Sequence, residues 1–242
     1  MIACVIPARF NSSRFPGKLL ALAGGKTVLQ RTYECARECT SIEKLFVATD
    51  NDQIADHVQT FGGSVIWTSP SCPSGTDRIA EAMQNEALKD ASIVVNLQGD
   101  HPLTSPSTLD KIVELLTSDP DASMATAIRP LKTWEEYLSP HCVKCVIDRF
   151  NNALYFSRSP IPYTNSRESL PPGYLHIGLY GYRASFLQIF KNLSNSGLQR
   201  SEDLEQLKAL ELGYRIKAAI VEDVALGIDT PEDLETLKKT FI

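Results

Sequence analysis

The fold is decided by residues 2–18, IACVIPARFNSSRFPGK, in which an apolar run ends in a small, polar and basic loop. Such a run is typical of a strand buried in an α/β sheet, and the loop after it offers backbone N–H groups that can cradle phosphates. Three cations, Arg9, Arg14 and Lys18, lie close together in this loop. Because a nucleoside triphosphate is strongly anionic, the stretch predicts a triphosphate site. A basic surface loop is the alternative.

Length and composition bound the class of protein. The chain has 242 residues, 43% of them hydrophobic and 22% charged, which is ordinary for a globular protein. We expect one domain over residues 1–242, with residues 130–200 forming an antiparallel subregion. The net charge of -5 argues against non-specific binding to nucleic acid. No apolar run is long enough for a membrane span, so no membrane association is expected.

The cysteines indicate a reducing compartment. All six are scattered along the sequence without the spacing of a disulfide framework, and the first residues lack the features of a signal peptide, so a cytoplasmic location is expected. Cys142 and Cys145 form a Cys-x-x-Cys pair beside His141. They lie in a strand-like run, residues 141–147, where positions three apart face opposite sides. With no second pair nearby, we expect packed or half-exposed thiols rather than a zinc or redox site.

Strand-like and helix-like segments alternate through the first half of the chain. The pattern predicts strands at residues 2–6, 44–49, 64–68 and 92–97, and helices at residues 27–39, 53–61, 77–87 and 106–117. This rhythm predicts the α/β class, with a mostly parallel twisted sheet and helices on both faces. Ligands of such folds bind beyond the carboxyl ends of the strands.

The second half has the pattern of an antiparallel region. It predicts a hairpin of residues 143–147 and 153–156, a loop at 159–172, strands at 175–182 and 216–221, and a helix at 201–212. A final helix is expected from Glu232 onward. Thr230 suits its N-cap and Pro231 its first helical position.

Two carboxylates are candidates for a divalent cation. Asp100 follows the apolar run at residues 92–97, and Mg²⁺ usually takes one or two carboxylates together with phosphate oxygens. Asp229 precedes the final helix, where a capping role is the alternative. A two-carboxylate site requires both loops to converge on the first one. No Gly-x-Gly-x-x-Gly follows the first strand, so a dinucleotide site is not expected.

A set of motifs runs through the chain in order. They are PAR (7–9), SRFPGK (13–18), ATD (48–50), SGTDR (74–78), NLQGD (96–100), ALYFSR (153–158), HIGLYGYR (176–183), EDLEQL (202–207) and GIDTPEDL (227–234). Together they strongly resemble the CMP-Kdo synthetases, the 3-deoxy-manno-octulosonate cytidylyltransferases of lipopolysaccharide synthesis. The resemblance implies a fold of the nucleotide-diphospho-sugar transferase type. It also implies a reaction in which the anomeric 2-hydroxyl of Kdo attacks the α-phosphorus of CTP, giving CMP-Kdo and pyrophosphate.

The resemblance also implies roles for particular residues. The catalytic groups would be Lys18, Arg14, Asp100 and Asp229, of which Asp100 and Asp229 would hold Mg²⁺. The nucleotide would lie against Ala8, Arg9, Arg14, Lys18, Ser74, Gly75, Thr76, Arg78 and Gln98. The sugar acid would lie against Gln98, Arg158, His176, Tyr180, Glu202 and Gln206, with the Arg158 guanidinium on its carboxylate. The family is typically dimeric, so a homodimer is implied, with contacts from residues 143–156.

One position departs from the family pattern. His101 follows Asp100, where the family usually has Glu. Because the aspartate itself is present, metal binding is expected to survive. Two other functions remain open: a cytidylyltransferase for another 2-keto sugar acid, of the sialic acid or 8-amino-Kdo type, and a non-catalytic nucleotide-sugar sensor on the same fold.

Overall fold

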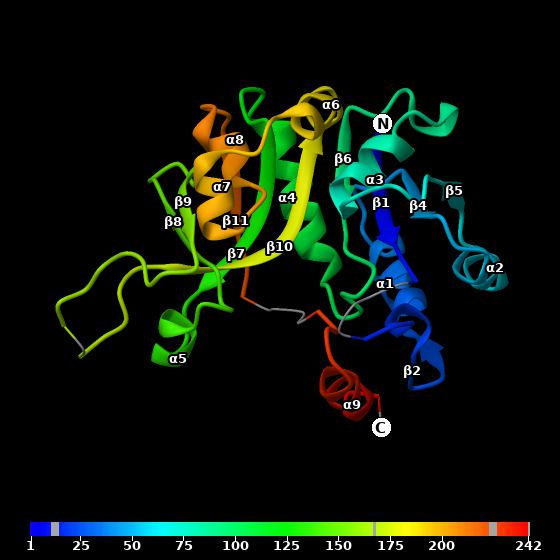
Figure 1. The fold of residues 1–242 in the computed structure, drawn as a ribbon, viewed down its shortest axis with the longest axis horizontal. Coiled ribbons are helices and arrows are strands. Elements are labelled where there is room, and N and C mark those ends of the chain that lie inside the picture. The colour runs from blue at the N-terminus through cyan, green and yellow to red at the C-terminus, as the bar shows by residue number, and fades with distance from the viewer. Residues whose placement is uncertain (11–14, 167, 223–226, 242) are drawn as a thin grey trace. The chain divides into compact units, whose positions relative to one another are not determined.

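The chain divides into two compact units. The computed structural model describes residues 1–10, 15–166, 168–222 and 227–241, and its elements are labelled in Figure 1. Unit 1 comprises residues 1–110 and 225–242, and unit 2 comprises residues 111–224. The expectation of a single domain stays a prediction.

Unit 1 is built on parallel strands. In it β1 pairs in parallel with β4 and with β6, and β4 pairs in parallel with β5. The strands are β1 (Ile2–Ala8), β4 (Lys44–Thr49), β5 (Val65–Trp67) and β6 (Ile93–Asn96). Six consecutive residues of β1, from Ala3 onward, are buried, which explains its unbroken apolar sequence. The mostly parallel α/β class is confirmed.

The helices of unit 1 begin where short polar side chains cap them. They are α1 (Val28–Arg37), α2 (Asp52–Thr60), α3 (Gly75–Ala82) and α9 (Pro231–Lys239), with N-caps Thr27, Asn51, Ser74 and Thr230. Each cap accepts a hydrogen bond from a backbone N–H of the first turn. The helix expected at 77–87 starts at Gly75, because Ser74 caps it, and ends at Ala82. A separate 3-10 turn, η2 (Glu86–Leu88), follows.

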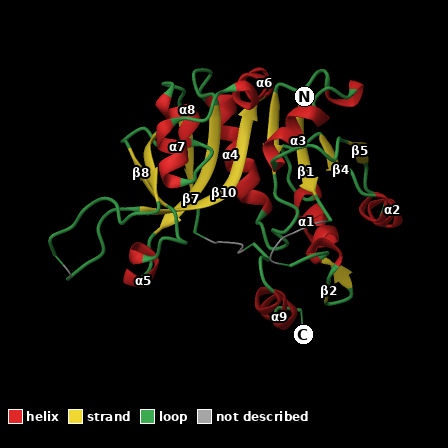
Figure 2. Cartoon of the chain, viewed as in Figure 1, coloured by secondary structure: helices red, strands yellow, loops and turns green. Residues whose placement is uncertain are grey.

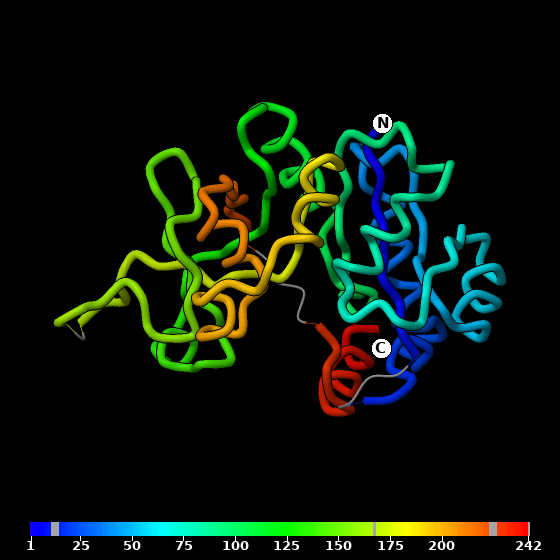
Figure 3. Tube along the Cα trace, turned by 45° about the horizontal axis from the view of Figure 1, so that its top comes forward, coloured from blue at the N-terminus to red at the C-terminus, as the bar shows by residue number. Residues whose placement is uncertain are grey.

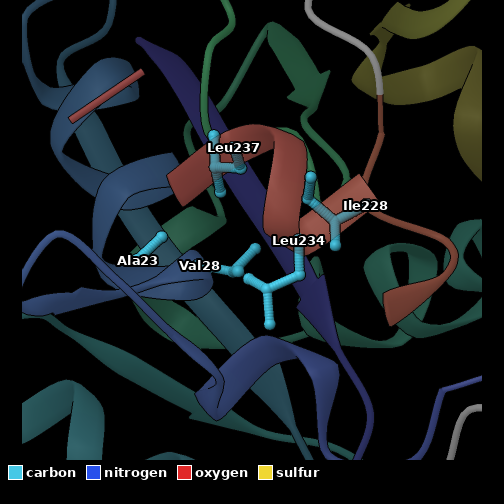
Figure 4. Packing of buried hydrophobic residues seen from close by; sticks show 5 residues of the cluster. All are labelled: Ala23, Val28, Ile228, Leu234 and Leu237. Atoms are coloured by element: carbon cyan, nitrogen blue, oxygen red, sulfur yellow. The ribbon is translucent and has the colours of Figure 1, made fainter. Parts of the chain in front are cut away.

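The C-terminal helix packs on the N-terminal part of the chain. Figure 4 shows Leu234 and Leu237 of α9 beside Val28 and Ala23, and these residues form one buried cluster with Ile228. Ala23 belongs to a small antiparallel ladder of β2 (Leu22–Ala23) and β3 (Lys26–Thr27), which follows the 3-10 turn η1 (Lys18–Leu20). In the rotated view of Figure 3 the red C-terminal segment again lies beside the blue N-terminal one.

Unit 2 is more antiparallel. Its strands are β7 (Met124–Pro130), β8 (Lys144–Ile147), β9 (Ala153–Ser157), β10 (Tyr174–Arg183) and β11 (Ile216–Ile220). Here β10 runs antiparallel to β7 and β8, β8 and β9 form the expected hairpin, and β11 runs parallel to β7. Figure 2 shows these strands in yellow. The helices are α5 (Trp134–Leu138), α6 (Ala184–Asn192), α7 (Gly197–Glu202) and α8 (Leu207–Glu211), while α4 (Pro106–Ser118) begins in unit 1 and continues into unit 2.

The prediction of a single helix at residues 201–212 is wrong, because the structure has two short helices there. Asp203 has a left-handed backbone, with φ of 53°, and it ends α7 at Glu202. A new helix, α8, starts four residues later at Leu207. A left-handed residue turns the chain out of the helical path, which the apolar spacing of this segment does not reveal.

The cysteines are free thiols, and Cys145 is buried while Cys142 is half-buried. Burial raises the pKa of the Cys145 thiol to about 12, so it stays protonated at neutral pH. Among the helices that the structure describes, none combines the length and the apolar character that a membrane span requires.

Candidate active site

A lysine ammonium lies between two carboxylates at one edge of unit 1. Lys18 Nζ donates to Asp100 Oδ2 at 2.5 Å and to Asp229 Oδ1 at 3.1 Å. Only 11% of the Lys18 side chain is exposed, against 21% for Asp100 and 42% for Asp229. The three residues come from sequence positions far apart. The structure therefore brings together three of the four residues expected to be catalytic, and the fourth, Arg14, lies outside the described residues.

Asp100 is placed by the turn that follows β6. A Cβ atom on Gly99 would lie 3.2 Å from the Pro7 carbonyl oxygen and 3.3 Å from the Leu19 methyl groups, so glycine allows this turn to approach the end of β1 closely. The Thr32 hydroxyl donates to the Gly99 carbonyl at 3.0 Å. The turn thus packs closely against the end of β1 and is hydrogen-bonded to α1.

Asp229 is placed by the N-terminus of α9. The Ile228 N–H donates to the Asp100 carbonyl at 2.9 Å, which joins the two carboxylate-bearing loops directly. Asp233 Oδ2 accepts from the backbone N–H groups of Asp229 and Thr230, which completes a capping box with the Thr230 side chain. The capping carboxylate is therefore Asp233, and the Asp229 carboxylate faces Lys18.

The His101 ring lies beside Asp100 and Gly227. Its Nε2 lies 3.7 Å from Asp100 Oδ1, and a Cβ atom on Gly227 would lie 3.0 Å from the same nitrogen. Its Nδ1 is buried and has no hydrogen-bond partner among the described residues. Burial lowers the pKa of His101, so the ring is neutral at physiological pH.

A polar cavity opens beside the ends of β1 and β4. It has a volume of about 200 Å³ and is lined by Arg9, Phe10, Asp50, Asn51, Pro70, Cys72 and Arg78. The Arg78 side chain is only 1% exposed and is held by Thr68 Oγ1 at 2.5 Å and by Asp50 Oδ1 at 3.0 Å. Its Nε is buried and lacks a partner among the described residues. One donor thus remains on a fixed guanidinium at this cavity.

The other residues expected at the nucleotide lie on the same unit. Ser74 caps α3 by accepting from the Asp77 N–H, and it donates its own proton to the Asp77 carboxylate at 2.6 Å. A Cβ atom on Gly75 would lie 3.4 Å from Pro7 and 3.5 Å from the Gln98 amide oxygen, so these loops meet at the end of β1. Thr76 is buried in the first turn of α3, Ala8 is buried at the end of β1, and Arg9 is exposed.

In unit 2, Arg158 and Glu202 hold one another. Glu202 accepts from the Arg158 N–H at 2.8 Å and from the Ser157 hydroxyl at 2.6 Å. The Arg158 guanidinium donates to the backbone carbonyls of Glu202, Pro140 and Asp203. The Arg158 side chain is 37% exposed, and its hydrogen bonds to described residues use three of its five N–H donors. Glu202 therefore positions Arg158, a role that the sequence did not suggest.

His176, Tyr180 and Gln206 are packed into the same unit. His176 Nε2 lies 2.9 Å from Thr126 Oγ1, its ring contacts Phe156, and its ring centroid is 5.4 Å from that of Tyr180. Burial lowers the pKa of His176 to about 3, so the ring is neutral. Gln206 is 3% exposed, and its Nε2 is buried without a partner among the described residues. Gln98, also expected at the sugar, belongs to unit 1.

Two residues at these sites were missed from the sequence. Asp50 pairs with Arg78 at the cavity, and it follows β4 directly, so the rule that ligands bind at carboxyl ends of strands points to it. Lys144 is fully buried and donates to the carbonyls of Ser139, Cys142 and Arg158. A lysine in a strand of alternating residues gives no sign in the sequence that its ammonium is buried against backbone carbonyls.

Comparison with known proteins gives a consistent result. Residues 3–217 match the model of the cytidylyltransferase family. A 3-deoxy-manno-octulosonate cytidylyltransferase of Protochlamydia amoebophila is 47% identical over 97% of this chain and 92% of its own length. A mitochondrial protein of the same name from Arabidopsis thaliana is 44% identical over 97% of this chain and 81% of its own length.

Solved structures agree with these relatives. A CMP:2-keto-3-deoxy-manno-octonic acid synthetase complexed with CTP superposes with a TM-score of 0.93 at 37% identity, covering 99% of this chain and 97% of its own. A 4-diphosphocytidyl-2C-methyl-D-erythritol synthase of Anaerococcus prevotii shares the fold, with a TM-score of 0.65 at 16% identity over 99% of this chain and 95% of its own.

Proposed function

We propose the following mechanism from the premise that the chain belongs to the cytidylyltransferase family, within its 3-deoxy-manno-octulosonate cytidylyltransferases. The chain is an enzyme that transfers CMP from CTP to the sugar acid Kdo, giving CMP-Kdo and pyrophosphate for lipopolysaccharide synthesis. The observation that carries the mechanism is the Lys18 ammonium held between Asp100 and Asp229, at the end of β1.

The two aspartates fit a divalent cation. An ammonium already bridges the two carboxylates, so the site accepts positive charge between hard oxygen donors. Among the described residues no group of three or more His, Cys, Asp or Glu side chains has metal-binding geometry, which leaves further coordination positions to phosphate oxygens and water. Asp100 and Asp229 would hold Mg²⁺. When bound, the ion neutralises charge at the α-phosphate and lowers the pKa of the attacking hydroxyl.

The protein cations stabilise the transferring phosphate. Charge accumulates on the phosphate oxygens and on the departing pyrophosphate as the sugar hydroxyl attacks. Lys18, Arg9 and Arg14 offset that charge, and donors fixed in advance are most effective. Lys18 is fixed by its two carboxylates and by burial. We assign it to the attacked phosphate and the two arginines to the rest of the triphosphate.

The cavity beside β4 suits the cytidine. Arg78 lines this cavity, and Ser74, Gly75 and Thr76 form the start of α3, where Gly75 lies beside Gln98. Cytosine offers a carbonyl acceptor and an amino donor, so both donors and acceptors are needed. The Gln98 amide, close to Gly75, can supply either.

The residues of unit 2 suit a polyhydroxy acid. Arg158 is a planar cation that can bind a carboxylate through two hydrogen bonds. Glu202 positions it, while Gln206 offers a buried donor, and His176 and Tyr180, whose rings lie 5.4 Å apart, add polar groups on the same unit. We assign these residues to Kdo.

We further propose a cytoplasmic homodimer. Phe150, Leu154 and Ile220, from the β8–β9 hairpin and β11, are exposed large hydrophobic residues of unit 2. Such side chains favour a contact between protein surfaces. Light scattering during gel filtration should give twice the mass of one chain, and the mass of a single chain would remove this proposal.

The reaction is tested by pyrophosphate release from CTP and Mg²⁺. Kdo, N-acetylneuraminate, 8-amino-Kdo and no sugar are compared, with ATP, UTP and GTP as nucleotide controls. Release only with CTP and Kdo is expected. Release with a different sugar acid would move the assignment to that substrate. If a folded protein binds CTP without any release, it would instead be a sensor.

A further inference from the structure

Helix α9 depends on packing for its position. It has nine residues, of which Leu234 and Leu237 are buried. Isolated helices of this length are marginal in water, so tertiary contacts must hold it. Those contacts are the cluster of Figure 4, in which the two leucines meet Ala23 and Val28.

A second contact lies just beyond the far end of α9. The Arg31 guanidinium carbon is 3.4 Å from the ring centroid of Phe241. Arg31 is itself fixed, because its Nε donates to the Ala23 carbonyl at 2.7 Å and its Nη2 donates to the Gly24 carbonyl at 2.8 Å. A guanidinium over an aromatic face is attracted by the ring quadrupole.

Gly24 permits this contact. Its φ is 56°, and a Cβ atom there would lie 2.5 Å from the Phe241 Cβ and 2.7 Å from Arg31 Nη2. The β2–β3 turn therefore approaches Phe241 as closely as a backbone can. Arg31, Gly24 and Phe241 form one interlocked contact, which we call the C-terminal latch.

The near end of α9 carries the functional carboxylate. Asp229 precedes the Thr230 cap, its N–H is held by Asp233 of the helix, and the Ile228 N–H donates to the Asp100 carbonyl. The helix and Asp229 therefore move as one body. We therefore expect a displacement of α9 to move the Asp229 carboxylate away from Lys18.

We propose that the C-terminal latch positions Asp229 for cation binding, making Arg31 and Phe241 positioning residues for the active site although neither touches it. The inference rests on the proposed function in that Asp100 and Asp229 hold the metal. Apparent affinity equals intrinsic affinity multiplied by the fraction of molecules in the competent state. Loss of the latch lowers that fraction, so it weakens metal binding without altering any ligand.

The test uses Phe241→Ala in the full chain, with Mn²⁺ as the probe. Free Mn²⁺ is measured by electron paramagnetic resonance, and binding that persists in Asp100→Asn is subtracted. We expect the half-saturating Mn²⁺ concentration to rise by about threefold or more in Phe241→Ala. Arg31→Met keeps the aliphatic stem but loses the guanidinium, and it should raise the half-saturating Mn²⁺ concentration as Phe241→Ala does. Phe241→Trp keeps an aromatic face for Arg31 and should have the same half-saturating Mn²⁺ concentration as the original chain. Lys239→Ala, on the exposed face of α9, is the matched control and should change nothing.

Amide hydrogen exchange gives a readout that needs neither metal nor turnover. Ile228 and Asp229 should exchange faster in Phe241→Ala, while amides of β1 keep their rates. Unchanged exchange, or a rise in half-saturating Mn²⁺ below about threefold, would overturn the latch. If the unsubstituted chain lacks Mn²⁺ binding that depends on Asp100, the metal assignment and the latch both fail. CMP transfer by that same chain, measured separately, decides the proposed reaction.

Discussion

Lys18 and its two carboxylates carry one net negative charge within a few ångströms. One ammonium faces two carboxylates, so the surplus negative charge attracts a further cation. If Asp100 and Asp229 hold a divalent ion, Lys18 would be available to donate to phosphate oxygens instead. Under the proposed mechanism Lys18 would neutralise the aspartates before substrate binds and would bind a phosphate oxygen afterwards.

Asp100→Asn removes one of these charges at nearly constant shape. We expect turnover to fall by about a thousandfold, because Asp100 is one of the two carboxylates that would hold Mg²⁺ at the reacting phosphate. Pyrophosphate release at saturating CTP, Kdo and Mg²⁺ measures this, and circular dichroism should show an unchanged fold. Asp56→Asn, an exposed carboxylate of the same unit, is the control and should keep full activity. Wild-type turnover in Asp100→Asn would refute the mechanism.

His101→Glu restores the side chain that the family usually carries. His101 makes no described hydrogen bond through Nδ1, and its Nε2 lies 3.7 Å from Asp100 Oδ1, so the change removes no described hydrogen bond of the ring. The added carboxylate lies near Asp100 and favours a divalent cation. We expect turnover to stay within about threefold of the original, with less Mg²⁺ needed for half-maximal rate. A collapse in turnover would show that His101 has a role of its own.

At the scale of elements, α5 is joined to β7 by an ion pair. Arg129 donates to both carboxylate oxygens of Glu136, at 3.0 and 2.5 Å, and its side chain is only 7% exposed. The guanidinium lowers the pKa of Glu136 from 4.5 to about 2, opposing the smaller effect of burial. A carboxyl group whose pKa is lower in the folded than in the unfolded protein stabilises the fold at every pH above its unfolded-state pKa. This stabilisation is lost as the pH falls from the unfolded-state pKa through the folded-state pKa.

Glu136→Gln should therefore lower the free energy of unfolding by about 2 kcal/mol at pH 7. The difference from the original chain should shrink as pH falls from 4.5 towards about 2. Urea unfolding at several pH values measures it. Glu135→Gln, at the exposed neighbouring position, is the control and should show no such trend. A difference independent of pH would contradict the ion pair.

Helix α4 packs closely against β10 at Gly181. A Cβ atom on Gly181 would lie 2.6 Å from Ile112 Cγ2 and 3.0 Å from Leu116 Cδ1, whereas one on Gly178 of the same strand would meet nothing within 4 Å. Gly181→Ala should destabilise the fold by about 1–3 kcal/mol through overpacking. Gly178→Ala should not destabilise it. Equal unfolding midpoints for the two variants would contradict this packing.

The sequence predicted elements where local signals were strong. Strand 44–49 matches β4 residue for residue, and Thr230 and Pro231 mark the start of α9 as expected. It missed β7, which is buried between its neighbours, and α6, whose cap makes no side-chain hydrogen bond. Periodicity also joined α7 and α8, because the left-handed backbone of Asp203 depends on tertiary context.

At the scale of the whole molecule, the residues that we assign to the two substrates belong to different units. The residues assigned to the triphosphate, the base and the metal belong to unit 1, and those assigned to the sugar acid belong to unit 2, with Gln98 as the exception. Spacing alone did not predict that Asp229 meets Lys18, because the contact spans 211 positions of sequence. The resemblance implied only that both residues act at the reacting phosphate, Lys18 on the triphosphate and Asp229 on the metal.

The most direct test of the account is to locate the new bond in the product. The enzyme is supplied with CTP, Mg²⁺ and Kdo labelled with ¹³C at position 2, and the mixture is followed by ¹³C and ³¹P nuclear magnetic resonance. We expect a coupling between carbon 2 and one phosphorus, appearing together with pyrophosphate. Release of free CMP with uncoupled Kdo, or a phosphorus coupled to another carbon, would contradict transfer to the 2-hydroxyl.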